Sequence, residues 1–378
     1  MTDDEISVAD NIRVCANAAD QVQCHARVLV DAYGDIRTNA TPAGLGAATL
    51  RSFYGITSNG STATTVAIVD SNGYPNALRD VQMYRSTFGL PTIVKCAVGG
   101  ARPCLAVVNQ TGGTSLPATD VGWDQETALD LDMVSAMCPN CNILLVQGTS
   151  ATFANLATAM GTAASNTAAT GARAVAVSNS YGGGEAGSTS FAAAYLPSGV
   201  AVTASSGDSG NAAGPQFPAS ATNATQTVIA VGGTSVHVGS SPRETVWSGA
   251  GSGCSTVYAR ASWQPANATA KCAKRAYADI SAVADPNTGV AVYAPTSATA
   301  SSFQVFGGTS VASPLIAGII GSIGSATTAK AIYAASNSGD NFDVTSGTNG
   351  TCGSPLCTAG VGWDGPTGLG TPIGPGEL

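Results

Sequence analysis

The segment Gly307-Gly308-Thr309-Ser310-Val311-Ala312-Ser313-Pro314 joins a glycine turn to an apolar run of small residues, Leu-Ile-Ala-Gly-Ile-Ile-Gly. Glycine adopts backbone angles closed to other residues, so the chain can approach a substrate closely here. Proline is tolerated near a helix start, where N–H groups lack partners. We therefore expect Ser310 at a helix N-terminus, where free N–H groups and the helix dipole favour negative charge. This suits a nucleophilic serine. Taken alone, however, the segment fits a plain serine N-cap better.

The composition favours a protein that works in acid and argues against several other classes. The chain has 378 residues, 46 glycines, only 10% charged residues and a formal net charge of −8. Few native ion pairs are lost when the carboxylates of such a protein become protonated. No basic footprint for nucleic acid is present, and no apolar run is long enough to span a membrane. The first residues also lack the apolar core of a signal peptide, so we expect none in this chain.

Ten cysteines fall into five local pairs. The pairs are Cys15/Cys24, Cys96/Cys104, Cys138/Cys141, Cys254/Cys272 and Cys352/Cys357. An even count in near neighbours indicates disulfides formed in an oxidising compartment, and hence a secreted protein. Zinc is the alternative, but zinc sites usually include histidine. The two histidines, His25 and His237, are both far along the chain from the closest pair, Cys138/Cys141.

Strands alternate with helices through most of the chain, which predicts a parallel sheet covered by helices on both faces. Residues 1–40 are interpreted as an N-terminal arm, pinned by Cys15/Cys24, with an edge strand in 26–34. The expected strands are 61–73, 142–148, 173–184, 200–210 and 227–235. The expected helices are 41–56, 76–89, 123–137, 151–166 and 188–199, and residues 96–122 are expected to be rich in loop. We see no linker and predict one domain.

Ligands of parallel sheets bind beyond the carboxyl ends of the strands. Asp70, the loop Ser180–Gly184 and Asp208 all occupy such positions in the predicted order. These residues are therefore candidates for a site that also includes Ser310.

A nucleophilic serine needs a base, and with only two histidines a carboxylate is the better candidate. Glu126 and Asp130 are spaced i, i+4 and share one helix face. Two such carboxylates repel when both are charged, so they favour sharing a proton, with one pKa raised. The alternative is a solvated helix face. Trp123 and its apolar neighbours favour burial of this helix, and Asp132 is the better candidate for a solvent-facing acid.

Asp208 lies in Ser206-Gly207-Asp208-Ser209-Gly210, directly after a predicted buried strand. A protonated carboxyl there could donate a hydrogen bond to an oxyanion, as an amide side chain does in other hydrolases. The alternative is a turn aspartate that caps its own backbone.

Together these motifs resemble the sedolisin family, the serine-carboxyl peptidases. The matching motifs, in order along roughly residues 41–378, are Glu126-x-x-x-Asp130, Ser-Gly-Asp208-Ser-Gly, Gly-Thr-Ser310-x-x-x-Pro, and Asp343-Val344 followed by Gly360-Val361-Gly362-Trp363-Asp364. The resemblance implies a subtilisin-like α/β fold with a mostly parallel seven-stranded sheet and helices on both faces. It makes 41–378 the peptidase domain. Family members are made with a long prodomain, so 1–40 is interpreted as a candidate propeptide remnant.

The resemblance also implies a role for each site residue. Ser310 would be the nucleophile and Glu126 the general base, while Asp130 would orient and acidify the glutamate. Asp208 and the backbone N–H of Ser310 would bind the oxyanion. Asp70 matches an acid that extends the hydrogen-bond network in some members.

The C-terminal motif implies a site for one Ca2+ ion. Calcium takes several oxygen ligands, including backbone carbonyls. Asp343 and Asp364 would give carboxylates, and Val344, Gly360 and Gly362 would give carbonyls. The alternative is a glycine-rich loop that binds no ion.

The sequence therefore predicts a secreted, acid-acting, monomeric endopeptidase with protein or peptide substrates, without nucleic acid or membrane partners. Two decoy serines are set aside: Ser235 lacks the following proline, and Ser209 lacks the context of a histidine-dependent motif. One rival function is an ordinary subtilisin, with His237 as the only candidate base within the domain. The other is a catalytically dead binding protein of the same fold.

Overall fold

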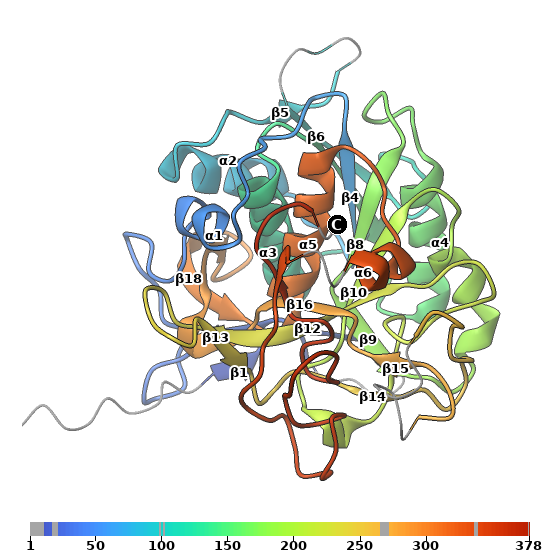
Figure 1. Cartoon of the computed structure of the whole chain (residues 1–378). Coiled ribbons are helices and arrows are strands. Elements are labelled where there is room, and N and C mark those ends of the chain that lie inside the picture. The colour runs from blue at the N-terminus through green and yellow to red at the C-terminus, as the bar shows by residue number, and fades with distance from the viewer. Residues whose placement is uncertain are drawn as a thin grey trace, which may run out of the picture.

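The computed structural model describes residues 11–16, 22–97, 100, 103–264, 272–335, 339–376 and 378. A central sheet has the strand order β13-β12-β10-β8-β4-β7-β6-β5, and β16 also pairs with β12 (Figure 1). Every neighbouring pair is parallel except β12 and β13. The strands are β4 (Thr65–Ser71), β5 (Val94–Lys95), β6 (Cys104–Asn109), β7 (Asn142–Gly148), β8 (Ala174–Asn179), β10 (Ala201–Ser205), β12 (Ile229–Val236), β13 (Glu244–Val246) and β16 (Ile280–Val283).

The sheet is mostly parallel, as predicted, but it has nine strands where the resemblance implied seven. Two of the nine, β5 and β13, are edge strands of two and three residues. Strands this short leave no periodic pattern in the sequence.

Helices cover both faces of the sheet. In Figure 1, β4 and β8 run between α5 on one side and α4 on the other. Alternate residues of β4 enter two separate cores: Val66 and Ile68 pack with α3 and α5, while Ala67 and Val69 pack with α4. This alternation explains why β4 is an unbroken apolar run, since each of its faces is buried. The helices are α1 (Ala47–Phe53), α2 (Ala77–Thr87), α3 (Val121–Met137), α4 (Phe153–Ser165), α5 (Thr309–Ile323) and α6 (Ala329–Ala335).

Residues of the N-terminal arm form strands in two smaller sheets. One has the order β1-β3-β18-β17 and the other β11-β9-β2. Because β1 pairs with its outer side, β3 is an inner strand and not the edge strand expected in 26–34. These strands are β1 (Asn11–Arg13), β2 (Gln23–Cys24), β3 (Arg27–Leu29), β9 (Tyr181–Gly184), β11 (Gln216–Phe217), β17 (Val290–Pro295) and β18 (Ser301–Gly307); two further pairs join β14 (Gly253–Cys254) to β15 (Ala276–Tyr277) and β19 (Asn341–Phe342) to β20 (Thr371–Pro372).

One local prediction was wrong, and one strand was not predicted. The helix expected at 188–199 is two short 3-10 turns, Ser188–Ser190 and Ala192–Tyr195. Serine and threonine side chains compete for backbone hydrogen bonds there, and Pro197 prevents the turns from extending. The loop-rich stretch expected at 96–122 also contains the inner strand β6, whose short apolar run is hidden among glycines and prolines.

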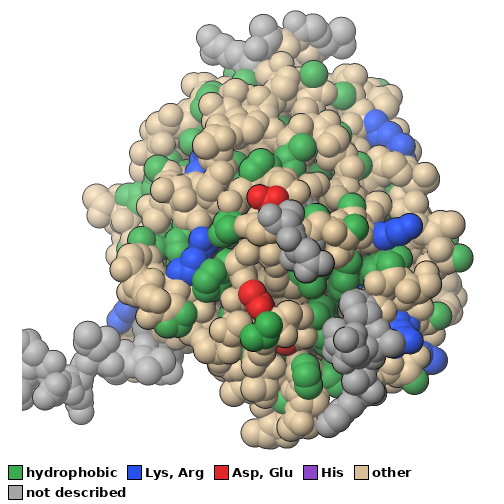
Figure 2. Space-filling view, in the orientation of Figure 1, with side chains coloured by type: hydrophobic (Ala, Val, Ile, Leu, Met, Phe, Trp, Pro, Cys, Tyr) green, Lys and Arg blue, Asp and Glu red, His purple; other side chains and the backbone are tan. Residues whose placement is uncertain are grey.

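All five predicted disulfides are present, including Cys138–Cys141. Figure 2 shows only scattered charged side chains on the face in view, in keeping with the charge-poor composition. Within the described part of the chain, no helix has both the length and the apolar character needed to cross a bilayer.

Candidate active site

Ser310 lies in the first turn of α5, as predicted, and is buried. Gly308 precedes the helix with a φ of 93°, in the region that favours glycine. A Cβ atom there would also lie 1.9 Å from the carbonyl oxygen of His25. Pro314 has no N–H to donate to the Ser310 carbonyl in the helix. The Ser180 hydroxyl donates to that carbonyl instead, at 3.5 Å. The glycine and the proline thus shape the turn that carries Ser310.

Glu126 lies beside the Ser310 hydroxyl and is wholly buried. Its Oε2 accepts the Ala26 N–H at 3.0 Å, and its Oε1 has no hydrogen-bond partner among the described residues. Burial and then the Asp70 charge raise the pKa of Glu126 well above its ordinary value, whereas the Ser310 hydroxyl lowers that pKa. In this structure Ser310 Oγ donates to the Ser180 carbonyl at 3.1 Å. Rotation of this hydroxyl would direct its proton toward the carboxylate.

Asp130 and Asp70 complete a group of three buried carboxyls with Glu126. Asp130 Oδ1 accepts the Ser180 hydroxyl at 2.8 Å. Burial, followed by the charges of Asp70 and Glu126, raises the pKa of Asp130 well above its ordinary value. Burial also raises the pKa of Asp70, at the end of β4, to about 7, and the Thr127 hydroxyl opposes this shift. The solvated-face alternative for Glu126 and Asp130 is therefore wrong, and the three carboxyls favour holding protons between them.

Asp132 is also buried, so its interpretation as a solvent-facing acid was wrong. Helix α3 packs against α5 on one side and β17 on another, so its polar residues are enclosed as well. The Asp132 carboxylate accepts the Tyr293 N–H at 2.9 Å. Burial raises the pKa of Asp132 well above its ordinary value.

Asp208 follows β10 and faces the start of α5. Its Oδ1 accepts the Thr309 N–H at 2.8 Å and the Thr309 hydroxyl at 3.0 Å. The alternative of a turn residue that only caps its own backbone is therefore wrong. Its Oδ2 is buried without a partner among the described residues. Burial raises the pKa of Asp208 to about 6, against the bonds from Thr309. Below that pH the carboxyl can donate a hydrogen bond.

The free oxygen of Asp208 points to the place where an oxyanion would form. A Cβ atom on Gly308 would lie 2.7 Å from Asp208 Oδ2 and 1.9 Å from the His25 carbonyl oxygen, so both oxygens converge there. The Ser310 N–H donates to the same His25 oxygen at 3.4 Å. The Ser310 N–H and a protonated Asp208 carboxyl can thus both donate hydrogen bonds to one oxygen.

Neither histidine ring hydrogen-bonds to Ser310. His25 Nδ1 pairs with the Ser205 hydroxyl at 2.7 Å, and burial lowers the pKa of His25 to about 3, so its ring is neutral. His237 follows β12, and its Nε2 lies 3.3 Å from the Thr245 hydroxyl. The backbone of His25 and Ala26 at the site was missed by the sequence reasoning, because a two-residue strand such as β2 leaves no pattern to find.

The two decoy serines make other contacts. The Ser235 hydroxyl donates to Asp285 at 2.6 Å, and Ser209 accepts from the Arg13 guanidinium at 2.6 Å.

Two of the predicted calcium ligands, Asp343 and Asp364, lie close to each other in the C-terminal loop. Asp343 Oδ2 accepts the Gly362 N–H at 2.8 Å, while its Oδ1 is buried without a partner in the described residues. Asp364 is buried and accepts the Gly360 N–H at 3.3 Å. Burial raises the pKa of Asp364 to about 7, and the charge of Asp343 adds to this rise. Two facing carboxylates with one unpartnered oxygen fit a hard cation.

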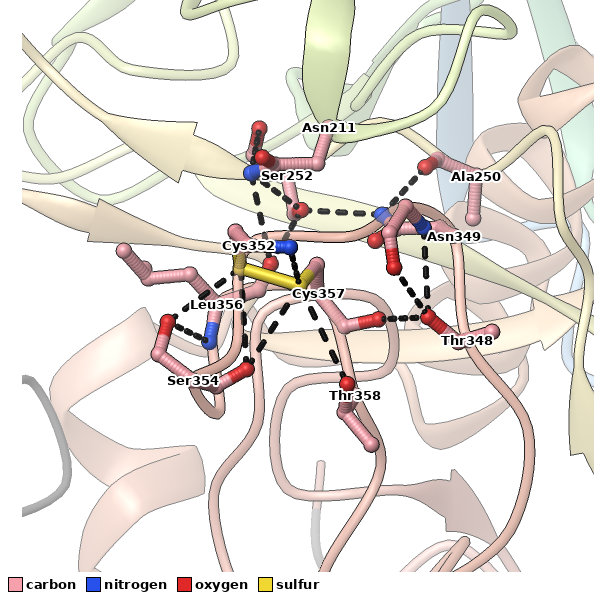
Figure 3. The surroundings of a disulfide bond; sticks show 11 residues. Asn211, Ala250, Ser252, Thr348, Asn349, Cys352, Ser354, Leu356, Cys357 and Thr358 are labelled. Atoms are coloured by element: carbon pink, nitrogen blue, oxygen red, sulfur yellow. Dashed lines mark hydrogen bonds between the residues drawn. A yellow bond between two sulfur atoms is a disulfide. The ribbon is translucent and has the colours of Figure 1, made fainter.

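The same C-terminal loop supports the loop that carries Asp208. Figure 3 shows the Cys352–Cys357 disulfide with Asn349, Asn211 and Ser252 around it. The Asn349 amide donates to the Ala250 carbonyl at 2.6 Å and to the Ser252 hydroxyl at 2.8 Å. The Asn211 N–H donates to the Asn349 carbonyl at 3.1 Å. Asn211 lies three residues after Asp208, so the C-terminal loop helps to fix the loop that carries Asp208.

Comparisons with known proteins identify relatives of this chain. No family model matches it. Kumamolisin from Bacillus sp. (strain MN-32) is 31% identical over 316 residues, which span 74% of this chain and 54% of kumamolisin. Sedolisin from Pseudomonas sp. (strain 101) is 35% identical over 176 residues, 41% of this chain and 28% of sedolisin. The chain thus spans about half the length, or less, of the curated relatives it matches.

The solved structure of a Pseudomonas sedolisin is also similar to this chain. That protein is a serine-carboxyl proteinase, complexed with two molecules of pseudo-iodotyrostatin. Its TM-score is 0.71 at 27% identity, over 88% of this chain and 96% of that chain. The similarity extends over nearly the whole of that structure, which confirms the predicted α/β fold of this chain.

Proposed function

This chain belongs to the sedolisin family, and from that premise we propose that it is a secreted, acid-acting serine-carboxyl endopeptidase that acts as a monomer on protein or peptide substrates. One observation carries the proposal: a buried glutamate, and not a histidine, adjoins the hydroxyl of the helix-start serine. The five disulfides support secretion, because such bonds persist in oxidising compartments.

In the proposed mechanism, Ser310 Oγ attacks the peptide carbonyl while Glu126 takes the hydroxyl proton. Asp208 Oδ2–H and the Ser310 N–H bind the oxyanion. Glu126 then protonates the leaving amine, and water repeats the cycle on the acyl-enzyme. Beyond the effect of burial, the charge of Asp70 raises the pKa of Glu126, and the charges of Asp70 and Glu126 raise the pKa of Asp130, so the three carboxyls titrate together.

The acid dependence follows from Asp208. Its pKa of about 6 means that it donates a hydrogen bond in acid, but is an anion that repels the oxyanion at higher pH. Glu126 must in turn hold enough negative charge to accept a proton, which sets a lower limit. Activity should therefore be highest in acid and should fall as the pH rises through about 6.

The proposal is tested with an unstructured protein substrate at pH 4. We expect the wild-type chain to cleave it, and the Ser310→Ala and Glu126→Ala variants to lack activity. A fluorophosphonate or acyl-aldehyde reagent should label Ser310 in the wild type. A subtilisin-like enzyme would instead be most active near neutral pH and would lose activity in His237→Ala. A catalytically dead binding protein would neither cleave nor become labelled.

We further propose that the C-terminal loop binds one Ca2+ ion. Asp343 and Asp364 would supply carboxylates, and Val344, Gly360 and Gly362 backbone carbonyls. The unpartnered Asp343 oxygen and the closeness of the two acids support this assignment. The bound ion would supply positive charge that offsets the carboxylates of Asp343 and Asp364.

A further inference from the structure

Two polar side chains lie side by side at the carboxyl ends of β4 and β7. The register of these parallel strands places Asp70 opposite Gln147. Both residues are on the sheet face that packs against α3, because Ile68 and Leu145, two residues earlier in each strand, belong to the core on that face. Asp70 and Gln147 are both wholly buried. A glutamine amide is therefore the neighbour of one acid in the group of three carboxyls.

The polar side-chain atoms of this pair have no hydrogen-bond partner among the described residues. Both oxygens of Asp70 and both amide atoms of Gln147 lack one, and so does the hydroxyl of Thr127, which lies near Asp70 on α3. Burial of unpartnered polar atoms costs free energy, so native proteins join such atoms to one another or to ordered water. The adjacent unpartnered atoms indicate one polar group around Asp70.

The neighbour of Gln147 on its other side already has partners. Asn109 of β6 lies opposite Gln147 in the parallel register of β6 and β7. Its amide donates to the Ser115 carbonyl at 3.0 Å, and its oxygen accepts the Thr111 N–H at 3.0 Å and the Thr111 hydroxyl at 2.9 Å. Asp70 is therefore the register neighbour of Gln147 that has unpartnered atoms.

The ionisable groups that face Asp70 come from α3 and β9. Beyond the effect of burial, the charge of Asp70 raises the pKa of Glu126 and of Asp130 on α3. Tyr181 on β9 interacts with the same charge, and its hydroxyl donates to Asn179 at 2.8 Å. The other elements that pack against β4, which are α4, α5, β7 and β8, contain no ionisable side chain. No cation in these elements stabilises a charged Asp70, so its neutral form is favoured.

A protonated carboxyl and a primary amide match each other as partners. The carboxyl O–H donates to the amide oxygen, and the amide N–H donates to the other carboxyl oxygen. Burial raises the pKa of Asp70 to about 7, against the Thr127 hydroxyl, so Asp70 carries a proton in acid. Neighbouring strands lie about 4.8 Å apart, so small side-chain rotations bring Asp70 and Gln147 within hydrogen-bond distance. The four unpartnered atoms of these two residues are the atoms that such a pair uses.

We propose that Gln147 is a positioning residue of the candidate active site, which pairs with the protonated carboxyl of Asp70 and turns its proton away from Glu126. The inference rests on the proposed function. Glu126 Oε1 is also buried without a partner among the described residues. A hydrogen bond from Asp70 to this oxygen would stabilise the charged form of Glu126 and make it a weaker base. Gln147 removes this competing donor and leaves the oxygen free to take the Ser310 proton.

The first test measures kcat/KM against pH for Gln147→Met in the full chain. Methionine is close to glutamine in length and shape but has no amide, so the Asp70 proton becomes free to turn to Glu126. We expect the acid limb of the profile to move to lower pH by about half a unit or more, and activity at pH 4 to fall. The limb near pH 6 that Asp208 sets should stay in place. The substrate is a fluorogenic peptide that spans a cleavage site mapped in the unstructured protein.

Two further variants separate pairing from packing. Leu145→Met is the matched control, because Leu145 is buried on the same face of β7, and its profile should equal that of the wild type. Gln147→Glu can both donate and accept while its carboxyl is protonated, so it should keep the wild-type activity at pH 4. A loss in Gln147→Glu as large as that in Gln147→Met would overturn the pairing.

The second test detects the pair without any need for activity. Infrared spectra at pH 4 show the C=O bands of protonated carboxyls, and the band that Asp70→Asn lacks is that of Asp70. We expect this band at higher wavenumber in Gln147→Met than in the wild type, because the amide no longer donates to the carboxyl oxygen. Leu145→Met should leave the band in place.

The outcomes separate this inference from the function on which it rests. If the wild type hydrolyses the peptide and Gln147→Met keeps both the acid limb and the Asp70 band of the wild type, the inference is wrong and the proposed peptidase stands. Equal changes in Leu145→Met would assign the effect to packing and would also overturn the inference. If the wild type does not hydrolyse the peptide, the proposed function fails, and the Asp70 band alone decides whether Gln147 pairs with Asp70.

Discussion

Asp208 has different partners on its two carboxyl oxygens, and this difference can be tested at the residue scale. Oδ1 accepts two hydrogen bonds from Thr309, while the buried Oδ2 is left to donate when protonated. An asparagine can accept on one atom and donate on the other at any pH. An alanine can do neither.

We therefore predict that two substitutions of Asp208 differ in the activity they leave. Asp208→Ala should lower kcat by about 10²–10³-fold, the usual loss for an oxyanion donor. Asp208→Asn should keep measurable activity and lose less of it as the pH rises through about 6, because its donor does not ionise. Peptide hydrolysis measured from pH 3 to 8 checks both. Equal loss in the two variants at pH 4 would contradict the role given to Asp208.

The residues of the candidate site could be found in the sequence where side-chain chemistry and spacing coincide. Glu126 and Asp130 share a helix face, and Asp208 follows a strand, so both positions were predictable from local pattern. The contacts of His25 and Ala26 are made by backbone atoms, which every residue has. No residue type in the sequence indicates where such backbone contacts are made.

At the scale of elements, the C-terminal loop connects the candidate calcium site to the Asp208 loop. Asn349 lies between Asp343 and Asp364 in the chain and bonds to Asn211 and Ser252 (Figure 3). If the candidate site binds Ca2+ as proposed, loss of the ion should loosen both the C-terminal loop and the loop that carries Asp208.

We predict that chelation by EGTA lowers the melting temperature. At a Ca2+ concentration a hundred times its Kd, binding contributes about 2.7 kcal/mol, which is roughly 3 °C in Tm for a protein of this size. Asp343→Asn should abolish this Ca2+-dependent shift, whereas the exposed control Asp35→Asn should keep it. A Tm of the wild type that is unchanged by EGTA would remove the support for a calcium site.

Helices and strands were predictable where the apolar pattern in the sequence is long. The seven-residue strands β4 and β7 and the helix α3 lie where the apolar runs placed them. The strand β6 and the turns at 188–199 were missed because tertiary pairing, and not local propensity, decides short segments.

At the scale of the whole molecule, many carboxyls are buried with raised pKa values. Burial raises the pKa of Asp70 and of Asp124 to about 7, and that of Glu244 above its ordinary value. A group whose pKa is higher in the folded state favours folding when protonated. Its contribution is complete below the unfolded-state pKa of about 4 and is lost as the pH rises through about 7.

We therefore predict that the protein is more stable in acid than near neutrality. At a fixed Ca2+ concentration, Tm should fall between pH 4 and pH 8 by roughly 6 °C, a change on the order of 5 kcal/mol. Asp70→Asn should reduce this fall, since a neutral amide has no proton to lose, whereas Asp35→Asn should not. Thermal unfolding followed by circular dichroism provides the measurement. A Tm that rises from pH 4 to pH 8 would show that the buried carboxyls are not the dominant charges.

The most direct measurement for the carboxylate-driven mechanism is kcat/KM of Glu126→Gln at pH 4, beside that of His237→Ala. Glutamine keeps the shape of Glu126 and its capacity to accept the Ala26 N–H, but it cannot take the proton of Ser310. We predict a loss of at least about 10³-fold in Glu126→Gln and a change of less than about twofold in His237→Ala. Wild-type activity in Glu126→Gln, or its loss in His237→Ala, would contradict the assignment of Glu126 as the base.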